Sequence, residues 1–148
     1  MTSVSTFLWF DTEAERAAEF YVASVPDSCI TGVTRGEDGS AFVVTLELAG
    51  HAITLLNGGP GHTHTDAASI QVVVDDQEAV DRLWDALTEG GKPGPCGWLE
   101  DRYGLSWQVV PAGLTELLSG ERAAEVGAVM RTMSKLDLKV LREAAERG

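Results

Sequence analysis

Hydrophobic and polar positions along the chain follow two periods, and the same succession of periods occurs twice. Short runs rich in valine, leucine, threonine and phenylalanine predict strands, because such side chains fit a pleated and half-buried surface. Between them, apolar residues that recur every three to four positions predict amphipathic helices. In the first half the predicted order is strand, helix, strand, strand, strand. The four strands cover residues 5–11, 29–34, 41–48 and 52–57.

The first predicted helix begins at a capping box. Thr12 and Glu15 have the spacing at which each side chain accepts a hydrogen bond from the other residue's amide. After them, alanine, tyrosine and valine repeat with helical spacing until the pattern ends near Pro26. We therefore expect a helix with one apolar face that packs against the strands.

The second half repeats this order after a linker of turn-forming residues, 58–67. A strand over 69–74 is followed by a cap at Asp75 and by a helix with an apolar stripe. A weak strand near 94–96 then leads into a hairpin. Its two strands run from Gly97 to Asp101 and from Leu105 to Val110, and Pro111, which has no amide hydrogen, ends the second.

Beyond Pro111 the pattern is helical. Leucines at 114, 117 and 118 indicate a short helical turn, and two amphipathic helices follow, interrupted at Ser134. We interpret residues 1–118 as one domain with modules at about 5–58 and 68–111. Residues 119–148 are interpreted as a C-terminal helical extension of the same globular unit, packed on the sheet or on a partner subunit.

Charge and composition narrow the function. The 148 residues carry a formal net charge of -12, which disfavours nucleic acid and anionic membranes as partners because both require clustered basic residues. No basic start precedes an apolar run, and no apolar run is long enough to cross a bilayer, so we expect a cytoplasmic protein. The two cysteines, Cys29 and Cys96, are expected to be reduced.

Several motifs carry a family resemblance. They are the opening Phe-Leu-Trp-Phe-Asp with a later Glu-Phe-Tyr, the Asp-x-x-Gly turn of the hairpin, and the segments 56–60, 69–72 and 94–111. Together with the paired strand and helix modules, they resemble the vicinal oxygen chelate superfamily, which has the glyoxalase and bleomycin-resistance fold, and within it the PhnB-like subfamily. The resemblance covers roughly residues 5–147. It implies an α+β fold of two βαβββ modules, each forming a half-open, barrel-like sheet around a cavity, in a homodimer.

The resemblance also implies a possible metal site. Proteins of this superfamily commonly hold a divalent metal through one side chain at the head of each module's first strand and one on each last strand. These positions match Thr6 and Ser69, and Thr54 and Gln108, in this sequence. All four side chains are neutral and are poor ligands for a transition metal. We therefore expect no cofactor, although a shift of register that brings Asp11 into the site leaves a different metal arrangement open.

Gln71 and Gln108 are the most informative polar residues, because each interrupts an apolar strand. Strand alternation places Ser69 beside Gln71 on one face of the sheet, where these groups either orient a small polar ligand or hydrogen-bond to one another or to buried water. Trp98 is the candidate for an aromatic wall. Asn57 either faces the mouth of a cavity or bonds backbone at a turn.

Other residues favour structural interpretations. Trp9 and Trp107 are expected to pack the core, and Cys96 is expected to be a packed thiol rather than a nucleophile. His62 and His64 lie in the linker, which is either solvated or closes over the cavity. Two histidines without a third ligand do not make a metal site.

The predicted function is binding of a small organic molecule in a module cavity without the usual divalent metal. The candidate ligand-binding residues are Gln71, Gln108, Ser69, Trp98, Asn57, Thr54 and Thr6. One alternative is an enzyme of the superfamily, of lyase, isomerase or dioxygenase type, with an atypical metal site. Another is a dimeric interaction module that uses the helical tail. PhnB-like proteins are often labelled demethylubiquinone methyltransferases, but the sequence has no Gly-rich loop for S-adenosylmethionine.

Overall fold

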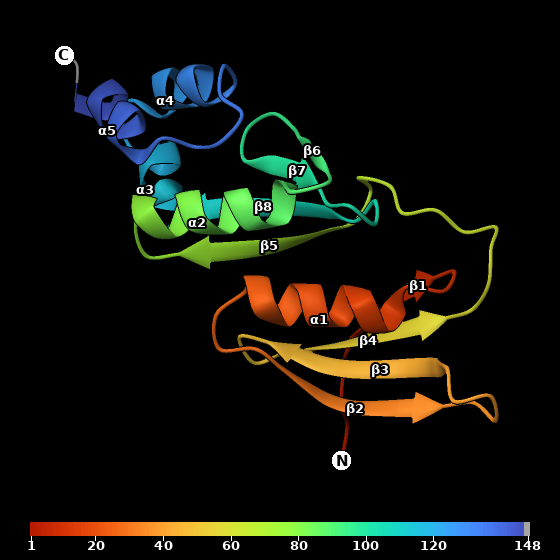
Figure 1. The fold of residues 1–148 in the computed structure, drawn as a ribbon. Coiled ribbons are helices and arrows are strands. Elements are labelled where there is room, and N and C mark those ends of the chain that lie inside the picture. The colour runs from red at the N-terminus through yellow and green to blue at the C-terminus, as the bar shows by residue number, and fades with distance from the viewer. Residues whose placement is uncertain (147–148) are drawn as a thin grey trace. The chain divides into compact units, whose positions relative to one another are not determined.

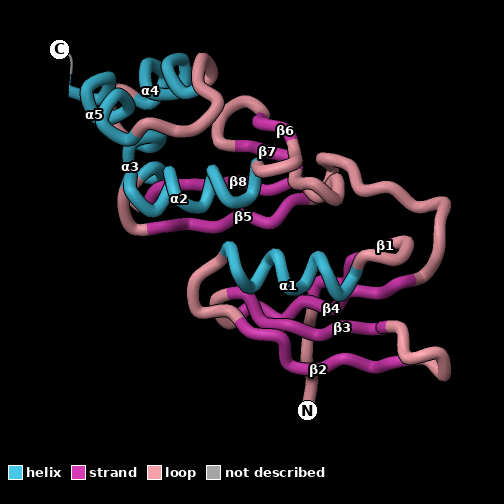
Figure 2. Tube along the Cα trace, in the orientation of Figure 1, coloured by secondary structure: helices cyan, strands magenta, loops and turns pink. Residues whose placement is uncertain are grey.

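The computed structural model describes residues 1–146, and the chain divides into two compact units. The first unit is Met1–Thr63, and the second begins at His64. Each unit contains a mixed four-stranded sheet with one long helix packed on one face (Figures 1 and 2). The predicted α+β class with two βαβββ-type modules and C-terminal helices is confirmed.

The first unit contains one helix, α1 (Ala14–Ser24), and four strands in the spatial order β1-β4-β3-β2. Strand β1 runs parallel to β4, and the other neighbouring strands are antiparallel. The strands are β1 (Thr6–Phe10), β2 (Cys29–Arg35), β3 (Ala41–Leu48) and β4 (His51–Asn57).

The core of the first unit lies between α1 and one face of its sheet. Tyr21 and three alanines of α1 are fully buried, as predicted from the helical stripe. The strands contribute alternate residues to the same core, among them Leu8, Val44 and Leu55. In each unit the helix packs on one face of the sheet. We call the other face, which points away from that helix, the open face.

The predicted capping box of α1 is wrong. The helix begins at Ala14 without a side-chain cap from the preceding residue, and Thr12 donates to Glu13 instead. Asn57 supplies the missing acceptor from the end of β4, since its Oδ1 accepts the Ala14 amide at 2.8 Å and its Nδ2 donates to the Ala41 carbonyl at 3.0 Å. A residue distant in sequence has therefore replaced the local cap.

The second unit repeats this topology. Its strands take the order β5-β8-β7-β6, β5 runs parallel to β8, and α2 (Gln77–Thr88) packs on one face through Leu83, Trp84 and neighbouring apolar residues. The strands are β5 (Ser69–Val74), β6 (Lys92–Pro93), β7 (Trp98–Glu100) and β8 (Ser106–Pro111).

Two local predictions for the second unit need correction. The side-chain cap of α2 is Asp76, whose Oδ1 accepts the Ala79 amide at 2.9 Å, and not Asp75. The weak strand predicted near 94–96 lies at β6, and residues 94–97 form the turn into β7. In that turn Cys96 has a φ of 58°, a conformation that side chains with a Cβ rarely adopt.

A buried carboxylate holds the hairpin between β7 and β8. Asp101 is 2% exposed, and its Oδ1 accepts the amides of Tyr103 and Leu105 at 2.8 and 3.1 Å. Its Oδ2 accepts the indole Nε1–H of Trp107 at 2.9 Å. The carboxylate therefore joins the hairpin turn to the centre of the core, where Trp107 is fully buried.

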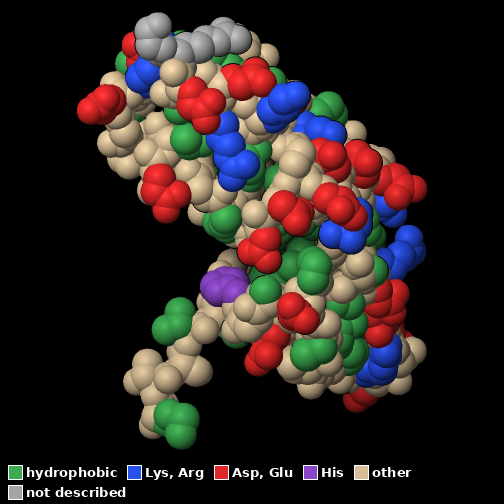
Figure 3. All heavy atoms as spheres, turned by 90° about the vertical axis from the view of Figure 1, so that its left-hand side faces the viewer, with side chains coloured by type: hydrophobic (Ala, Val, Ile, Leu, Met, Phe, Trp, Pro, Cys, Tyr) green, Lys and Arg blue, Asp and Glu red, His purple; other side chains and the backbone are tan. Residues whose placement is uncertain are grey.

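Three helices follow β8, namely α3 (Leu114–Ser119), α4 (Ala123–Met130) and α5 (Leu138–Glu146). They enclose a small core of their own that includes Val126, Leu136 and Leu141. No helix in residues 1–146 has the length and hydropathy needed to span a membrane. Acidic side chains are spread over the face of the molecule shown in Figure 3, in keeping with the net charge of -12.

Candidate functional site

A row of three side chains crosses the open face of the second unit. Gln71 of β5 is the register partner of Gln108 of β8, which in turn faces Trp98 of β7. Register partners in a sheet point to the same face and lie close enough to interact. The strands therefore bring two amides and an indole together from positions 71, 98 and 108, as the alternation of the sequence predicts for the two glutamines.

The amides form a short hydrogen-bonded chain. Gln108 donates from Nε2 to the Ser69 hydroxyl at 2.9 Å, and Gln71 donates from Nε2 to Gln108 Oε1 at 3.4 Å. Contact between the amides is one of the two alternatives that the sequence leaves open. These two bonds orient Gln108 and leave the Gln71 carbonyl oxygen outside the chain, where it is available as an acceptor.

A cavity of about 280 Å³ lies at this row. Its polar lining includes both glutamines, and Trp98 contributes an aromatic wall. The remaining wall is largely apolar and comes from the ends of β5 and β8 and from the C-terminal helices, including Val73, Val110, Leu118 and Met130. A mostly apolar concavity with a few convergent polar groups is typical of small-molecule sites.

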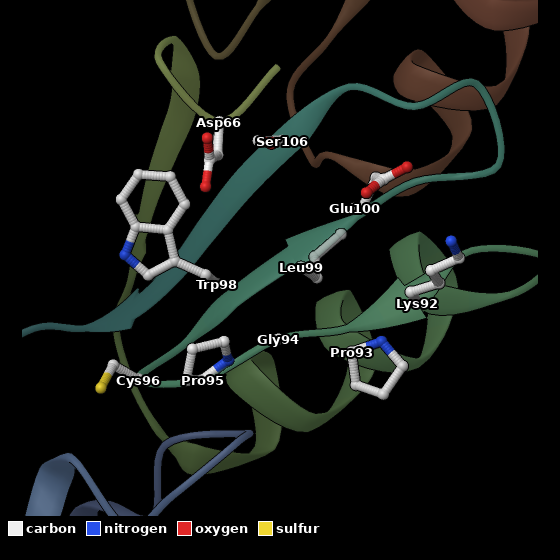
Figure 4. A pocket seen from close by; sticks show the side chains of 10 residues that line it. All are labelled: Asp66, Lys92, Pro93, Gly94, Pro95, Cys96, Trp98, Leu99, Glu100 and Ser106. Carbon is white, nitrogen blue, oxygen red and sulfur yellow. The ribbon is translucent and has the colours of Figure 1, made fainter. Parts of the chain in front are cut away.

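A second cavity, of about 440 Å³, is also lined by Trp98 (Figure 4). Three charged residues line it, Asp66, Lys92 and Glu100, together with the prolines before and after Gly94. Figure 4 shows the indole of Trp98 and the carboxylate of Asp66 directed into the same space. Trp98 and Cys96 line both cavities.

The C-terminal extension holds the turn that lines these cavities. The amide of Cys96 donates to the Met133 carbonyl at 2.9 Å, and the Ser134 hydroxyl donates to the Gly94 carbonyl at 2.6 Å. We call residues 132–138, which run from just after α4 to the first residue of α5, the strap. The residue pattern predicts an extension packed on the sheet or on a partner. It does not predict this contact, because no motif in the strap indicates that it binds the turn at Cys96.

The strap is itself tied to α2. Gln77 donates from Nε2 to the Leu136 carbonyl at 2.9 Å and accepts the Leu138 amide at 2.8 Å. Lys135 forms an ion pair with Asp81 at 2.9 Å. The Gln77 amide and, secondarily, the Lys135 ammonium hold the pKa of the Asp81 carboxyl below its ordinary value.

The open face of the first unit carries hydroxyls in the corresponding row. Ser5 Oγ and Thr54 Oγ1 are hydrogen-bonded at 3.2 Å, and Thr45, the register partner of Thr54, accepts from the Thr31 hydroxyl at 2.9 Å. Each unit thus has a serine bonded to a side chain on its last strand, Ser5 to Thr54 and Ser69 to Gln108. The repeat therefore matches Ser5 with Ser69.

The predicted grouping of Thr6 with Thr54 is corrected by this register. Thr6 pairs with Ile53, which is buried under α1, and its hydroxyl lies 2.9 Å from Nε2 of His51. Successive residues of a strand point to opposite faces, so an offset of one residue moves a side chain from the open face to the helix face. Thr6 and Thr54 therefore do not share a site.

Asn57 is likewise no part of the open face. It pairs with the buried Phe10, and both ends of its amide are bonded to backbone, as described above. Trp107 packs the core as predicted, whereas Trp9 lies on the open face of the first unit. The Trp9 indole donates to the Gly59 carbonyl at 2.9 Å and contacts the ring of His62, with centroids 4.5 Å apart.

The donor set at these positions does not fit a transition metal. Ser5 and Thr54 in the first unit, and Ser69 and Gln108 in the second, offer only neutral oxygens and amide groups, with no charge to offset that of an ion. Within residues 1–146, no group of three or more histidine, cysteine, aspartate or glutamate side chains is arranged to hold a metal ion.

Solved structures with the same fold include three informative relatives. A PhnB protein from Bacillus cereus, described as a 3-demethylubiquinone-9 3-methyltransferase, is 28% identical with a TM-score of 0.68 over 75% of this chain and 100% of its own. A protein from Pseudomonas aeruginosa is 18% identical, with a TM-score of 0.61 over 74% and 98%. A fosfomycin resistance protein from Listeria monocytogenes, complexed with Mn(II) and sulfate, is 16% identical, with a TM-score of 0.56 over 80% and 98%.

No curated protein matches the chain. A family model described as 3-demethylubiquinone-9 3-methyltransferase matches residues 2–110, which include both sheets, the row of Gln71, Trp98 and Gln108, and the hairpin held by Asp101. The chain therefore belongs to this family, the PhnB-like group of proteins with the glyoxalase and bleomycin-resistance fold.

Proposed function

We propose that the second unit binds a small, planar organic molecule against its open face, and that it does so without a divalent metal. The observation that carries this proposal is the row of Gln71, Gln108 and Trp98 along a cavity of about 280 Å³. An indole wall offers stacking, and the Gln71 carbonyl offers an acceptor for an N–H or O–H of the ligand.

The polarity of this cavity selects the class of ligand. No charged residue lines it, and its apolar wall consists of valine, leucine and methionine side chains. A charged ligand would lose its hydration there without an opposite charge in return, which disfavours it. A neutral heterocycle or aromatic amide both stacks on the indole and hydrogen-bonds to the amide chain.

The description of the family does not by itself assign a methyl transfer to this chain. Transfer from S-adenosylmethionine requires a site for that nucleotide, and the sequence contains no Gly-rich loop of the kind that binds one. The relative crystallised with Mn(II) shares the fold at 16% identity, and the neutral donor set here argues against an equivalent ion.

The proposal can be tested by titrating the protein with nicotinamide, benzamide and uracil as planar amide probes. Binding is followed by the indole N–H signal of Trp98 in nitrogen–proton correlation spectra, assigned with a Trp98→Phe variant. We expect at least one probe to shift this signal saturably. Gln108→Leu should weaken binding about tenfold, because it removes the centre of the amide chain and leaves Ser69 and Gln71 without their partner.

Thr54→Val is the matched control, because it changes the equivalent position of the first unit and should leave binding unchanged. Metal content of the purified protein is measured in parallel. A stoichiometric transition metal that disappears in Gln108→Ala would overturn the metal-free proposal. Equal loss of binding in Gln108→Leu and Thr54→Val would contradict the assignment to the second unit.

A further inference from the structure

The cavity of about 440 Å³ differs in chemistry from the cavity of about 280 Å³ at Gln71 and Gln108, which we call the amide cavity. Its lining includes Asp66, Glu100 and Lys92, so it carries two negative charges and one positive charge. The remaining lining residues include prolines, Cys96, Trp98 and Ser106, none of which is basic. The two cavities share the indole of Trp98 and differ in the charge of their other lining residues.

Two charged residues of opposite sign lie at one end of this cavity. Lys92 of β6 and Glu100 of β7 are register partners, so their side chains leave the sheet at neighbouring points. Figure 4 shows both on the side of the cavity away from Trp98. Asp66 is the charged lining residue at the end that holds the indole.

Asp66 is fixed at that end by a turn. The Thr65 carbonyl accepts the Ala68 amide at 3.4 Å, and the Thr65 hydroxyl accepts the Ala67 amide at 3.3 Å, which closes the chain around Asp66 just before β5. None of the ion pairs within residues 1–146 involves Asp66. Its carboxylate is therefore available to a cation that enters the cavity.

Trp98 supplies the second element of a cation site. An organic ammonium over the face of an indole is attracted by the negative face of the ring, and tryptophan is the most effective aromatic residue for this interaction. Asp66 and Trp98 line the same cavity, and Figure 4 labels both at one end of it, so one cation in the cavity can approach both groups. The net charge of -12 further raises the local concentration of cations.

We propose that this cavity binds a quaternary or tertiary ammonium group between the indole of Trp98 and the carboxylate of Asp66. Ammonium groups that carry alkyl substituents fit better than metal ions or the unsubstituted ammonium ion. They lose less hydration energy when they leave water for a site formed by an indole and prolines. The site shares the indole with the amide cavity but depends on Asp66, which does not line that cavity, and its occupation does not require the proposed planar ligand.

Choline is the probe, and the control is dimethylbutanol, its uncharged isostere in which a tert-butyl group replaces the trimethylammonium. Both are titrated into the full chain at constant ionic strength, and the indole N–H signal of Trp98 is followed. We expect choline to give a saturable shift and the isostere to give none. Equal responses to the two compounds would overturn the proposal.

Asp66→Asn should weaken choline binding about fivefold, the range expected for a partly exposed ion pair. The matched control is Asp85→Asn, an exposed carboxylate of α2 that lines neither cavity and changes the net charge by the same amount. Lys92→Met should strengthen binding, because it removes the positive charge from the cavity. Identical affinities for Asp66→Asn and Asp85→Asn would refute the role of Asp66.

Gln108→Leu separates this proposal from the proposed function. The variant should bind choline as the parent protein does while losing the planar amide probe. If the amide probes fail to bind the parent protein but choline binds and depends on Asp66, the proposed function is wrong and the ammonium site stands. If Gln108→Leu loses choline binding while its Trp98 signal is otherwise unchanged, the two cavities are one site and this proposal fails.

Discussion

The two units share one topology but differ in the side chains of their open faces. In the first, small hydroxyls form two hydrogen-bonded pairs between neighbouring segments, Ser5 with Thr54 and Thr31 with Thr45. In the second, Gln108 occupies the position of Thr54, and an indole extends the row across the next strand. The backbone is repeated and the open face is not, so the chemistry of each unit depends on which side chains its alternating positions carry.

The units also differ in the polar side chain that joins the elements within each unit. Asn57 joins the start of α1 to β3 in the first unit, whereas a buried carboxylate, Asp101, joins the hairpin to Trp107 in the second. Only the second unit carries the strap and its helices. The site that we propose is therefore supported by more of the chain than the corresponding face of the first unit. Substitutions at these polar groups test the comparison.

Asp101→Ala should have the largest effect. It removes the acceptor of three hydrogen bonds in a nearly buried place, and we expect a loss of about 3–4 kcal/mol in the free energy of unfolding. Urea unfolding followed by near-ultraviolet circular dichroism measures it. Asp101→Asn keeps the acceptor for the two turn amides and should cost less. Equal losses for both variants would show that the Trp107 bond dominates.

Asn57→Ala should destabilise the protein by about 2 kcal/mol, because it leaves the Ala14 amide and the Ala41 carbonyl without their side-chain partner. Asn57→Asp keeps an acceptor at the start of α1 and should retain part of the stability. The same urea unfolding assay compares the two. If Asn57→Ala lowers the free energy of unfolding as much as Asp101→Ala does, the two polar side chains contribute equally and the expected order is wrong.

Gln77→Ala should cost about 1–2 kcal/mol, since it breaks the two hydrogen bonds that Gln77 makes to the strap and leaves only the Lys135–Asp81 ion pair between α2 and the strap. Amide hydrogen exchange is the appropriate measurement, because local release of the strap should lower the protection of Cys96 and Gly97, whose amides donate to Met133 and Ser134. Protection in β1 and β4 of the first unit should not change. Uniform loss of protection in both units would contradict a local role.

The Asp81–Lys135 pair should have the smallest effect and a characteristic pH dependence. The folded pKa of Asp81 is lowered, so its contribution to stability is present above the ordinary carboxyl pKa and disappears as the pH falls through the lowered value. Asp81→Asn should lower the free energy of unfolding, measured by urea at pH 7, by less than about 1 kcal/mol. The difference from the parent protein should vanish in strong acid and shrink in high salt. A difference that persists unchanged in high salt would assign the effect to the Gln77 hydrogen bond rather than to Lys135, and one that persists in acid would contradict the expected pH dependence.

Much of the frame of each unit could be predicted from residue patterns. The helical stripes that include Tyr21 and Trp84, and the hairpin that ends at Pro111, all lie where periodicity places them. Helix starts were less predictable. Thr12 and Asp75 fit local capping rules, but the structure uses Asn57 and Asp76, because an acceptor contributed by tertiary packing or by the next residue satisfies the same amides.

For the candidate site, alternation alone placed Ser69 and Gln71 on one face, and the register of β5 with β8 adds Gln108 to them. It failed for Thr6, because a difference of one residue between the two repeats reverses the face, and low similarity between the halves does not define the offset that closely. The cavity of about 440 Å³ was not predicted, since Asp66 lies in a linker segment without periodicity and lines the same cavity as Trp98 only after folding.

The sequence by itself determined the class of fold, the repeat, the buried faces and the absence of charged donors at the expected metal positions, because these follow from composition and local period. The tertiary structure alone decided which hydroxyl pairs with Thr54, what caps α1, and how the strap holds the turn at Cys96. Those contacts join residues far apart in the chain, and their geometry depends on register and packing rather than on spacing.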